Sequence, residues 1–385
     1  MTGPDRPAAR SPAVTTGSPA AAEAADTPVD VVCLGESMVT FLPLRPGRLA
    51  DVPAFERTIG GAESNVACAL AAAGHAARWV SRVGADGFGD HLVEAIGSYG
   101  VDVGAVRRDA HRPTGVYFRT ADDRTDDGHE VVYYRAGSAA SAMSPATVPY
   151  RDLWSGRILH LSGITAALSD DCLALMRDLL ARRPGRPLVS FDVNHRPGLW
   201  RDAAGPRVLL ELARGADIVF VGADEAEAAW GLRGARAIGD ALPEPGVLVV
   251  KLGAGGAVVM ERAGADGHGG RAGTDGHGAR AGADGHGARA ATLVRPPVVD
   301  VVAPVGAGDA FAAGFLSATL RGLPVRDRIR HGHLMAAAVL TVPGDLTQPP
   351  ARAHADRLVA LDDTAWGRLR LGPGWTGDDQ EVRTR

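Results

Sequence analysis

The sequence predicts an α/β fold in three layers, with a mostly parallel sheet between two layers of helices. Apolar segments of strand length alternate along the chain with segments of helical periodicity. The strand segments are hydrophobic throughout, which is typical of parallel strands covered on both faces. Two further regions, residues 41–58 and 104–140, contain short alternating β segments, which predict a small antiparallel sheet that stands off the main body as a lid.

Hydrophobic patterning gives the position of each element. The strands of the main sheet are predicted at residues 29–34, 79–83, 158–162, 188–192, 218–221 and 247–252. The helices are predicted at residues 62–73, 90–99, 170–182, 208–214, 224–230, 307–321 and 327–341. In the lid, 115–119 and 130–135 are expected to form a hairpin, and a second hairpin should join 258–260 to 292–295.

Composition excludes several classes of protein. The chain has 385 residues, 45% of them hydrophobic, which suffices for one large α/β domain or two medium ones. A net charge of -4 gives no basic footprint for nucleic acid. Cys33, Cys68 and Cys172 lie far apart, so we expect neither a disulfide framework nor a zinc site. No segment approaches membrane-spanning length, and we expect a cytoplasmic protein with no membrane partner.

Residues 262–288 are three copies of a nine-residue unit. The repeat places His268, His277 and His286 at equal spacing, each two residues after an aspartate. It is either a weak metal-binding tract or a disordered expansion of a hairpin loop, and its glycine density favours the second interpretation. We therefore expect a folded domain over 29–371 with a low-complexity insertion at 262–291, a disordered tail at 1–28 and a loose tail at 372–385.

Residues 305–315, Val-Gly-Ala-Gly-Asp-Ala-Phe-Ala-Ala-Gly-Phe, combine an anion cradle with a candidate base. The backbone N–H groups of Gly306, Ala307 and Gly308 can converge on a phosphate at the start of the predicted helix. The carboxylate of Asp309 lies one residue inside that helix, where it can take a proton from a hydroxyl beside the phosphate. The alternative is a glycine-containing cap on an alanine-rich core helix.

Seven separated motifs resemble, in their order along the chain, the ribokinase-like carbohydrate kinases, and most closely the 2-keto-3-deoxygluconate kinases among them. The motifs are Gly60-Gly61-Ala-Glu-Ser-Asn65, Thr114-Gly115-Val-Tyr117, Tyr133-Tyr134-Arg135, Ser162-Gly163-Ile164-Thr165, Phe191-Asp192-Val-Asn194-His-Arg196, Lys251-Leu-Gly253-Ala-Gly-Gly256 and Gly306-Ala-Gly-Asp309. The tyrosine–arginine motif is the most specific for this branch.

The resemblance implies roles for these residues. Asp309 would remove the proton of the accepting hydroxyl while the cradle holds the charge that develops on the transferred group. Arg135 and Arg196 would bind a substrate carboxylate. The other implied sugar contacts are Gly60, Gly61, Asn65, Tyr117, Tyr133, Ile164 and Asp345. The implied ATP contacts are Asn194, Glu225, Lys251, Gly253, Gly256, Gly306 and Gly308.

Three of these assignments have open alternatives. Tyr117 is otherwise a packing residue of the lid, Arg196 a member of a surface salt bridge, and Asp345 an ordinary turn aspartate. The chain also departs from the family, because Ala303 and Val305 occupy the positions of an aspartate and a threonine that help to bind a monovalent cation. We therefore expect no protein metal site of that form.

A second departure concerns magnesium. The family's Asn-x-x-Glu element reads Gly222-Ala-Asp-Glu225 here, which keeps the glutamate and loses the asparagine. Mg²⁺ is still expected to arrive with ATP, since its main ligands are phosphates and waters.

The expected function is ATP-dependent phosphorylation of 2-keto-3-deoxygluconate at its terminal hydroxyl, giving 2-keto-3-deoxy-6-phosphogluconate. A fructokinase or other neutral-sugar kinase is the alternative within the class. A catalytically silent sugar- or nucleotide-binding regulator and a plain oligomerising α/β protein are the alternatives outside it. We expect a homo-oligomer formed through the lid, with a sugar acid and ATP as the small-molecule partners.

Overall fold

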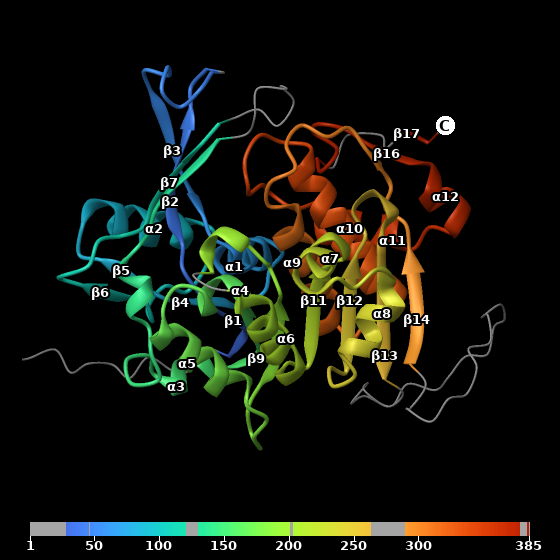
Figure 1. Ribbon diagram of the computed structural model, residues 1–385. Coiled ribbons are helices and arrows are strands. Elements are labelled where there is room, and N and C mark those ends of the chain that lie inside the picture. Colours follow the sequence, from blue (N-terminus) through green and yellow to red (C-terminus); the bar gives the residue numbers. More distant parts are fainter. Residues whose placement is uncertain are drawn as a thin grey trace, which may run out of the picture.

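An eight-stranded sheet runs through the middle of the molecule (Figure 1). The computed structural model describes residues 28–45, 47–120, 130–200, 203–262, 289–377 and 383–384. The strand order is β14-β13-β12-β11-β10-β9-β1-β4, and all pairs from β12 to β4 are parallel, whereas β12, β13 and β14 form an antiparallel edge. The strands are β1 (Val29–Leu34), β4 (Ala77–Val80), β9 (Gly156–Ser162), β10 (Leu188–Asp192), β11 (Ile218–Gly222), β12 (Val247–Lys251), β13 (Ala257–Arg262) and β14 (Arg289–Val294).

Helices cover both faces of this sheet. One face packs on α1 (Ala62–Ala72), α2 (Gly87–Ser98), α9 (Ala307–Leu320), α10 (Val325–Leu340), α11 (Arg352–Val359) and α12 (Asp363–Arg368). The other packs on α3 (Tyr150–Leu153), α4 (Gly163–Ala166), α5 (Asp170–Leu180), α6 (Gly205–Gly215), α7 (Ala223–Trp230) and α8 (Gly234–Ala241). Successive residues of β1 alternate between the two cores: Val31 belongs to the first and Val32 to the second, both fully buried. The predicted three-layer fold is confirmed.

Most differences from the predicted elements occur at their ends. Helix α2 begins three residues earlier than predicted, because the Asp86 carboxylate caps the N–H groups of Phe88 and Gly89 at 3.1 and 2.8 Å. The predicted strand 79–83 is split into β4 and β5 (Arg82–Gly84), since β5 leaves the main sheet to pair with β6 (Arg107–Asp109). Five short helices were not predicted: α3, α4, α8, α11 and α12.

The lid is a four-stranded sheet in the order β3-β2-β7-β8, and it projects from the main body (Figure 1). Its strands are β2 (Met38–Pro43), β3 (Phe55–Gly60), β7 (Val116–Arg119) and β8 (Val131–Tyr134). The predicted fully antiparallel arrangement is wrong at one pair, because β2 and β7 are parallel. Both strands run outward from the body, and each returns through its own antiparallel partner.

The chain beyond residue 371 is packed further than predicted. Strand β16 (Leu369–Leu371) pairs with β15 (Val298–Val299) and β17 (Arg383–Thr384). Trp375 is only 3% exposed and belongs to the first core, so the predicted loose tail does not begin at residue 372. The predicted tail at 1–28, apart from residue 28, and nearly all of the histidine repeat lie outside the described residues. The other domain limits stay predictions.

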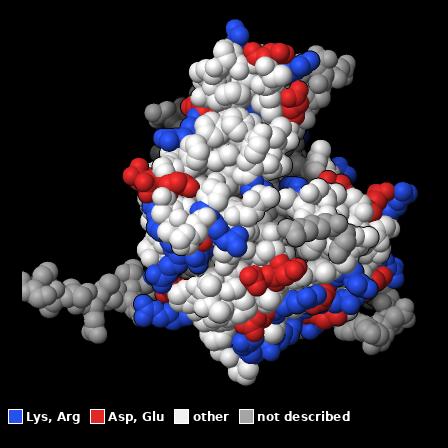
Figure 2. Space-filling view, turned by 60° about the vertical axis from the view of Figure 1, so that its left-hand side comes forward, with Lys and Arg blue, Asp and Glu red and all other residues white. Residues whose placement is uncertain are grey.

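The surface carries charges of both signs. In the face shown in Figure 2, basic and acidic side chains are interspersed along the base of the molecule and on the lid. Among the described residues, no helix is both long and apolar enough to cross a membrane.

The hairpin of β13 and β14 yields the first prediction. Arg262 and Arg289 are paired residues at its open end, so their backbones are already as close as a two-residue turn requires. Replacing residues 263–288 by Asn-Gly should leave the melting temperature, and the turnover of the activity expected from the sequence, close to those of the full chain. Thermal melts and turnover assays would check this, and a large loss of stability, or zinc binding that disappears with the deletion, would contradict it.

Candidate active site

A cavity of about 590 Å³ lies at the carboxyl ends of the parallel strands, beneath the lid. This end of an open α/β sheet is where ligands ordinarily bind. The cavity lining includes most of the residues singled out in the sequence: Gly60, Gly61, Asn65, Tyr117, Tyr133, Arg135, Ile164, Asn194, Arg196, Glu225, Lys251, Gly306, Gly308, Asp309 and Asp345. Ala307, Gly253 and Gly256 are not among the lining residues, although Ala307 lies within the cradle and the two glycines belong to the turn that follows Lys251.

Asp309 lies in the first turn of α9 and faces this cavity. The Asn65 side chain donates a hydrogen bond from Nδ2 to Asp309 Oδ2 at 2.9 Å. Burial raises the pKa of Asp309 to about 7, with Asp192 and Asp345 adding to the rise and Asn65 and Lys251 opposing it. A carboxylate with a pKa near neutrality is suited to act as a general base. Asn65, expected to contact sugar, is therefore in direct contact with the candidate base.

The anion cradle begins at Gly306, which adopts a left-handed φ of 80° and precedes α9 without a side-chain cap. A Cβ atom there would lie 2.5 Å from the carbonyl oxygen of Asp345, so only glycine fits. As in every helix, the first N–H groups have no partner within the helix, and glycine has no side chain that could cap them. They remain available to an anion.

Lys251 is the only lysine of the sequence, and its ammonium group lies beside the cradle. Its Nζ is 2.9 Å from Asp192 Oδ2 and 3.6 Å from the position of a Cβ on Gly308. Burial acts to lower the pKa of Lys251, but Asp192, Glu225 and Asp309 outweigh it and raise the pKa. The group is thus held as a cation next to the place where an anion would bind.

Asn194 follows β10 in a conformation that side chains rarely adopt. Its φ is 40°, and it is the one non-glycine residue with positive φ among those the structure describes. Its Oδ1 is buried and has no hydrogen-bond partner among the described residues, although the residue lines the cavity. Such strain together with an unsatisfied polar atom is typical of a ligand contact.

Arg135 lies under the lid and is already paired. Its guanidinium forms an ion pair with Glu36, whose side chain is 1% exposed, and lies 5.8 Å from the Tyr133 ring centre. Tyr133 stacks on Tyr117 with ring centres 5.3 Å apart, whereas Tyr134 packs against Phe118 away from the cavity. Tyr133 and Arg135 therefore share the face that their spacing predicts.

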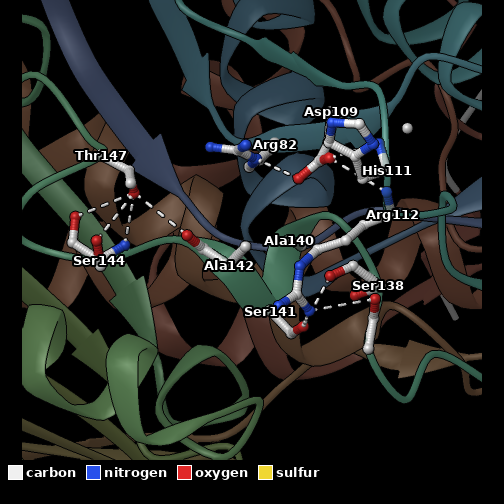
Figure 3. A network of polar contacts seen from close by, with 12 residues as sticks. Arg82, Asp109, His111, Arg112, Ser138, Ala140, Ser141, Ala142, Ser144 and Thr147 are labelled. Atoms are coloured by element: carbon white, nitrogen blue, oxygen red, sulfur yellow. Dashed lines mark hydrogen bonds and ion pairs between the residues drawn. The ribbon is translucent and has the colours of Figure 1, made fainter.

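The loop after Arg135 is held by a polar network. Ser138 Oγ donates to Glu36 at 2.5 Å, and Ser141 Oγ donates to the Ser138 carbonyl at 2.7 Å. Figure 3 shows how Arg112 reaches this loop, and how Asp109 accepts hydrogen bonds from Arg82 and from the adjacent backbone. Arg135 is thus held by Glu36, and Glu36 is held in turn by the loop that Arg112 contacts.

Arg196 is half exposed at the rim, where its Nη1 lies 3.3 Å from Glu225 Oε1. The other Glu225 oxygen accepts from the Gly222 N–H at 2.8 Å and caps α7. The salt-bridge alternative for Arg196 is therefore realised in this structure, and Arg135 is the more deeply buried of the two candidate arginines.

Comparisons with known proteins agree with this geometry. The model of the "pfkB family carbohydrate kinase" matches residues 29–352. The chain belongs to the pfkB family of carbohydrate kinases. The 2-dehydro-3-deoxygluconokinase of Bacillus subtilis (strain 168) is 35% identical over 332 residues, 84% of this chain and 93% of the relative. That of Thermoproteus tenax is 32% identical over 341 residues, 88% and 96% of the two chains.

A solved structure shares the fold of this pfkB kinase. It is an uncharacterized sugar kinase from Pyrococcus horikoshii in complex with ATP, with a TM-score of 0.69 and 22% identity, which covers 87% of this chain and 99% of that chain. The family assigns the present chain the activity of an ATP-dependent sugar kinase.

Sequence reasoning missed several polar residues of the kinase site. Asp192 pairs with Lys251, Glu36 with Arg135, and Arg119 with Asp345. Asp192 had a usable signal, since it is a carboxylate at the end of an apolar strand. Arg119 and Glu36 carried none, because their partners are far away in the sequence.

Magnesium would be held at this site together with the nucleotide. The described residues contain no cluster of three or more His, Cys, Asp or Glu that could hold a metal ion. Glu225 faces the cavity, but its two oxygens already accept from Gly222 and Arg196, which suits a contact through water. When bound, the ion would offset the phosphate charge.

We predict that Asp309→Asn reduces turnover by about 10²- to 10⁴-fold, the usual effect of removing a general base. The amide keeps the shape but cannot accept the proton, so ATP binding measured by calorimetry should be preserved. The matched control is Asp240→Asn, an exposed aspartate on α8. Near-normal turnover of Asp309→Asn would exclude this residue as the base.

The pH profile provides an independent check. Because only ionised Asp309 accepts a proton, and its pKa is raised to about 7, kcat/KM for the sugar should rise as pH increases through 7 and level off above it. Below that point we expect roughly a tenfold loss per pH unit. A profile that stays flat from pH 5 to 8 would mean that Asp309 titrates at its ordinary pKa.

Proposed function

We propose that this kinase phosphorylates 2-keto-3-deoxygluconate, also called 2-dehydro-3-deoxygluconate, at its terminal hydroxyl. The observation that carries the proposal is Arg135, a buried guanidinium that lines the same cavity as Asp309. A guanidinium is the best partner for the two oxygens of a carboxylate. The names of the two relatives above, both 2-dehydro-3-deoxygluconokinases, support the same substrate.

The proposed reaction needs no covalent enzyme intermediate. The sugar lies between the lid tyrosines and Asp309, with its carboxylate toward Arg135 and its terminal hydroxyl toward the base. Asp309 takes the hydroxyl proton as the oxygen attacks the γ-phosphorus of ATP, and the bond to ADP breaks. The N–H groups at the start of α9 and the Lys251 ammonium hold the negative charge of the transferred group.

ATP would occupy the side of the cavity formed by Asn194, Glu225 and Lys251. The turn after Lys251 supports this assignment, because Gly253 and Gly256 have φ values of 54° and 104° that allow the backbone to approach a ligand closely. We propose that Mg²⁺ enters with the nucleotide and contacts Glu225 through water.

A neutral-sugar kinase, such as a fructokinase, is the second candidate. The ion pair between Arg135 and Glu36 favours a neutral sugar. The buried Glu36 carboxylate already neutralises the guanidinium charge that would otherwise attract the carboxylate of a sugar acid. A carboxylate substrate must then share the guanidinium with Glu36. The five N–H donors of arginine permit this sharing, and Arg135 Nε has no hydrogen-bond partner in the ranges that the structure describes.

We also propose that the kinase assembles through its lid. The lid leaves large apolar side chains in contact with water, among them Val132 at 40% and Tyr134 at 64% exposure. Exposed apolar groups gathered on one element are typical of an interaction surface.

We predict that Arg135→Ala discriminates between the two substrates. On 2-keto-3-deoxygluconate, kcat/KM should fall by about 30- to 5,000-fold, which corresponds to the roughly 2 to 5 kcal/mol that removing one partner of a desolvated charge pair usually costs. On fructose the loss should be much smaller. Because both substrates are measured on the same variant, any structural effect of leaving Glu36 unpaired is common to both. Equal losses would remove Arg135 from carboxylate recognition and favour the fructokinase.

A further inference from the structure

Arg119 and Asp345 form an ion pair where the lid meets the main body. Arg119 ends the lid strand β7, and Asp345 follows α10 in the body. The guanidinium Nη2 lies 2.7 Å from Asp345 Oδ1, and the two side chains are only 7% and 8% exposed. Contacts between residues 226 positions apart in the sequence do not form unless the lid and the body meet.

Asp345 has two other contacts that matter for catalysis. Its carboxylate hydrogen-bonds to the Tyr117 hydroxyl and faces Gly60, where a Cβ atom would lie 3.3 Å from Oδ2. Its backbone lies over Gly306, so close that a Cβ on this glycine would meet the Asp345 carbonyl oxygen. One residue therefore contacts the lid, the sugar side of the cavity and the anion cradle.

We propose that Arg119 is a positioning residue that fastens the lid to the anion cradle through Asp345. The inference rests on the proposed function of the cavity as a sugar-kinase site. Breaking a buried ion pair by removing one partner leaves an uncompensated charge, which favours an open arrangement in which water reaches Asp345. With Arg119 present, the same charge is satisfied only when the lid is closed.

The role has two consequences for the reaction. A fastened lid holds the sugar hydroxyl beside Asp309, so the loss of Arg119 should raise the KM for the sugar. A fastened lid also excludes water, so the loss should increase the amount of ATP hydrolysed per sugar phosphorylated. The KM for ATP should change less than the KM for the sugar, because the proposed nucleotide contacts Asn194 and Lys251 lie outside the lid.

The experiment compares Arg119→Met with Arg48→Met. Arg48 is a matched control because it lies in the lid, has the same charge and pairs on the surface with Asp51, both side chains being 67% exposed. For Arg119→Met we expect the sugar KM to rise by about 30-fold, the lower end for truncating a buried charge pair. Arg48→Met should behave as wild type, and Arg119→Lys, which keeps the charge, should lie between.

A second measurement does not depend on the identity of the sugar. Amide hydrogen exchange of the free protein should be faster in Arg119→Met than in wild type, both in strands β2, β7 and β8 and at residues 304–310. Faster exchange in the lid alone, or the same exchange in both methionine variants, would overturn the role of Arg119. If Arg119→Met does not fold, Arg119→Lys and Arg119→Gln provide the same comparison.

The two proposals fail in different ways. If wild type phosphorylates neither sugar acids nor neutral ketoses, the proposed function is wrong, and hydrogen exchange still decides whether Arg119 fastens the lid. If wild type is active and Arg119→Met keeps the wild-type sugar KM and the wild-type ratio of ATP hydrolysed to sugar phosphorylated, the positioning role is wrong and the kinase assignment stands.

Discussion

Three aspartates converge on one cavity, and each must be paired or neutral because it is largely removed from water. Asp192 is paired with Lys251, and Asp345 with Arg119. Asp309 forms no ion pair within the part of the chain that the structure describes, and the amide of Asn65 holds it instead. Burial raises the pKa of Asp309 to about 7, and the negative charges of Asp192 and Asp345 add to this rise. The arrangement of neighbours thus distinguishes the base from the other two aspartates.

The residues of the site that the sequence predicts are those whose partners are close to them in the chain. The cradle and Asp309 were predictable because the glycines, the helix start and the carboxylate are adjacent in the chain, and their chemistry follows from local geometry. Tyr133 and Arg135 were placed on one face by the two-residue period of a strand. Asn65 was found as a motif residue, but its contact with Asp309, 244 residues away, was not. Side chains that meet only through the tertiary fold leave no local pattern.

The same reasoning applies to the fold. The main strands are buried on both faces, and their continuous apolar segments placed them within a few residues. The lid was harder to predict, because whether β2 and β7 run parallel depends on the direction in which each leaves the body. The lid is also packed differently. Its interior consists of a few aromatic contacts, such as Phe41 stacked on Phe118 with ring centres 4.7 Å apart, rather than two layers of helices. An element with so little buried apolar surface opens more easily than the body does.

The single lysine of this chain, Lys251, lines the cavity and can be modified selectively. All other basic side chains are arginine, so an amine-directed reagent has one side-chain target, and that target lies beside Asp192 and the first turn of α9. The rate at which the Lys251 side chain is acylated should therefore report whether the catalytic cavity is occupied, and the α-amino group is the other amine of the chain. Where most proteins would need an engineered probe, this kinase has a natural reporter group in its centre.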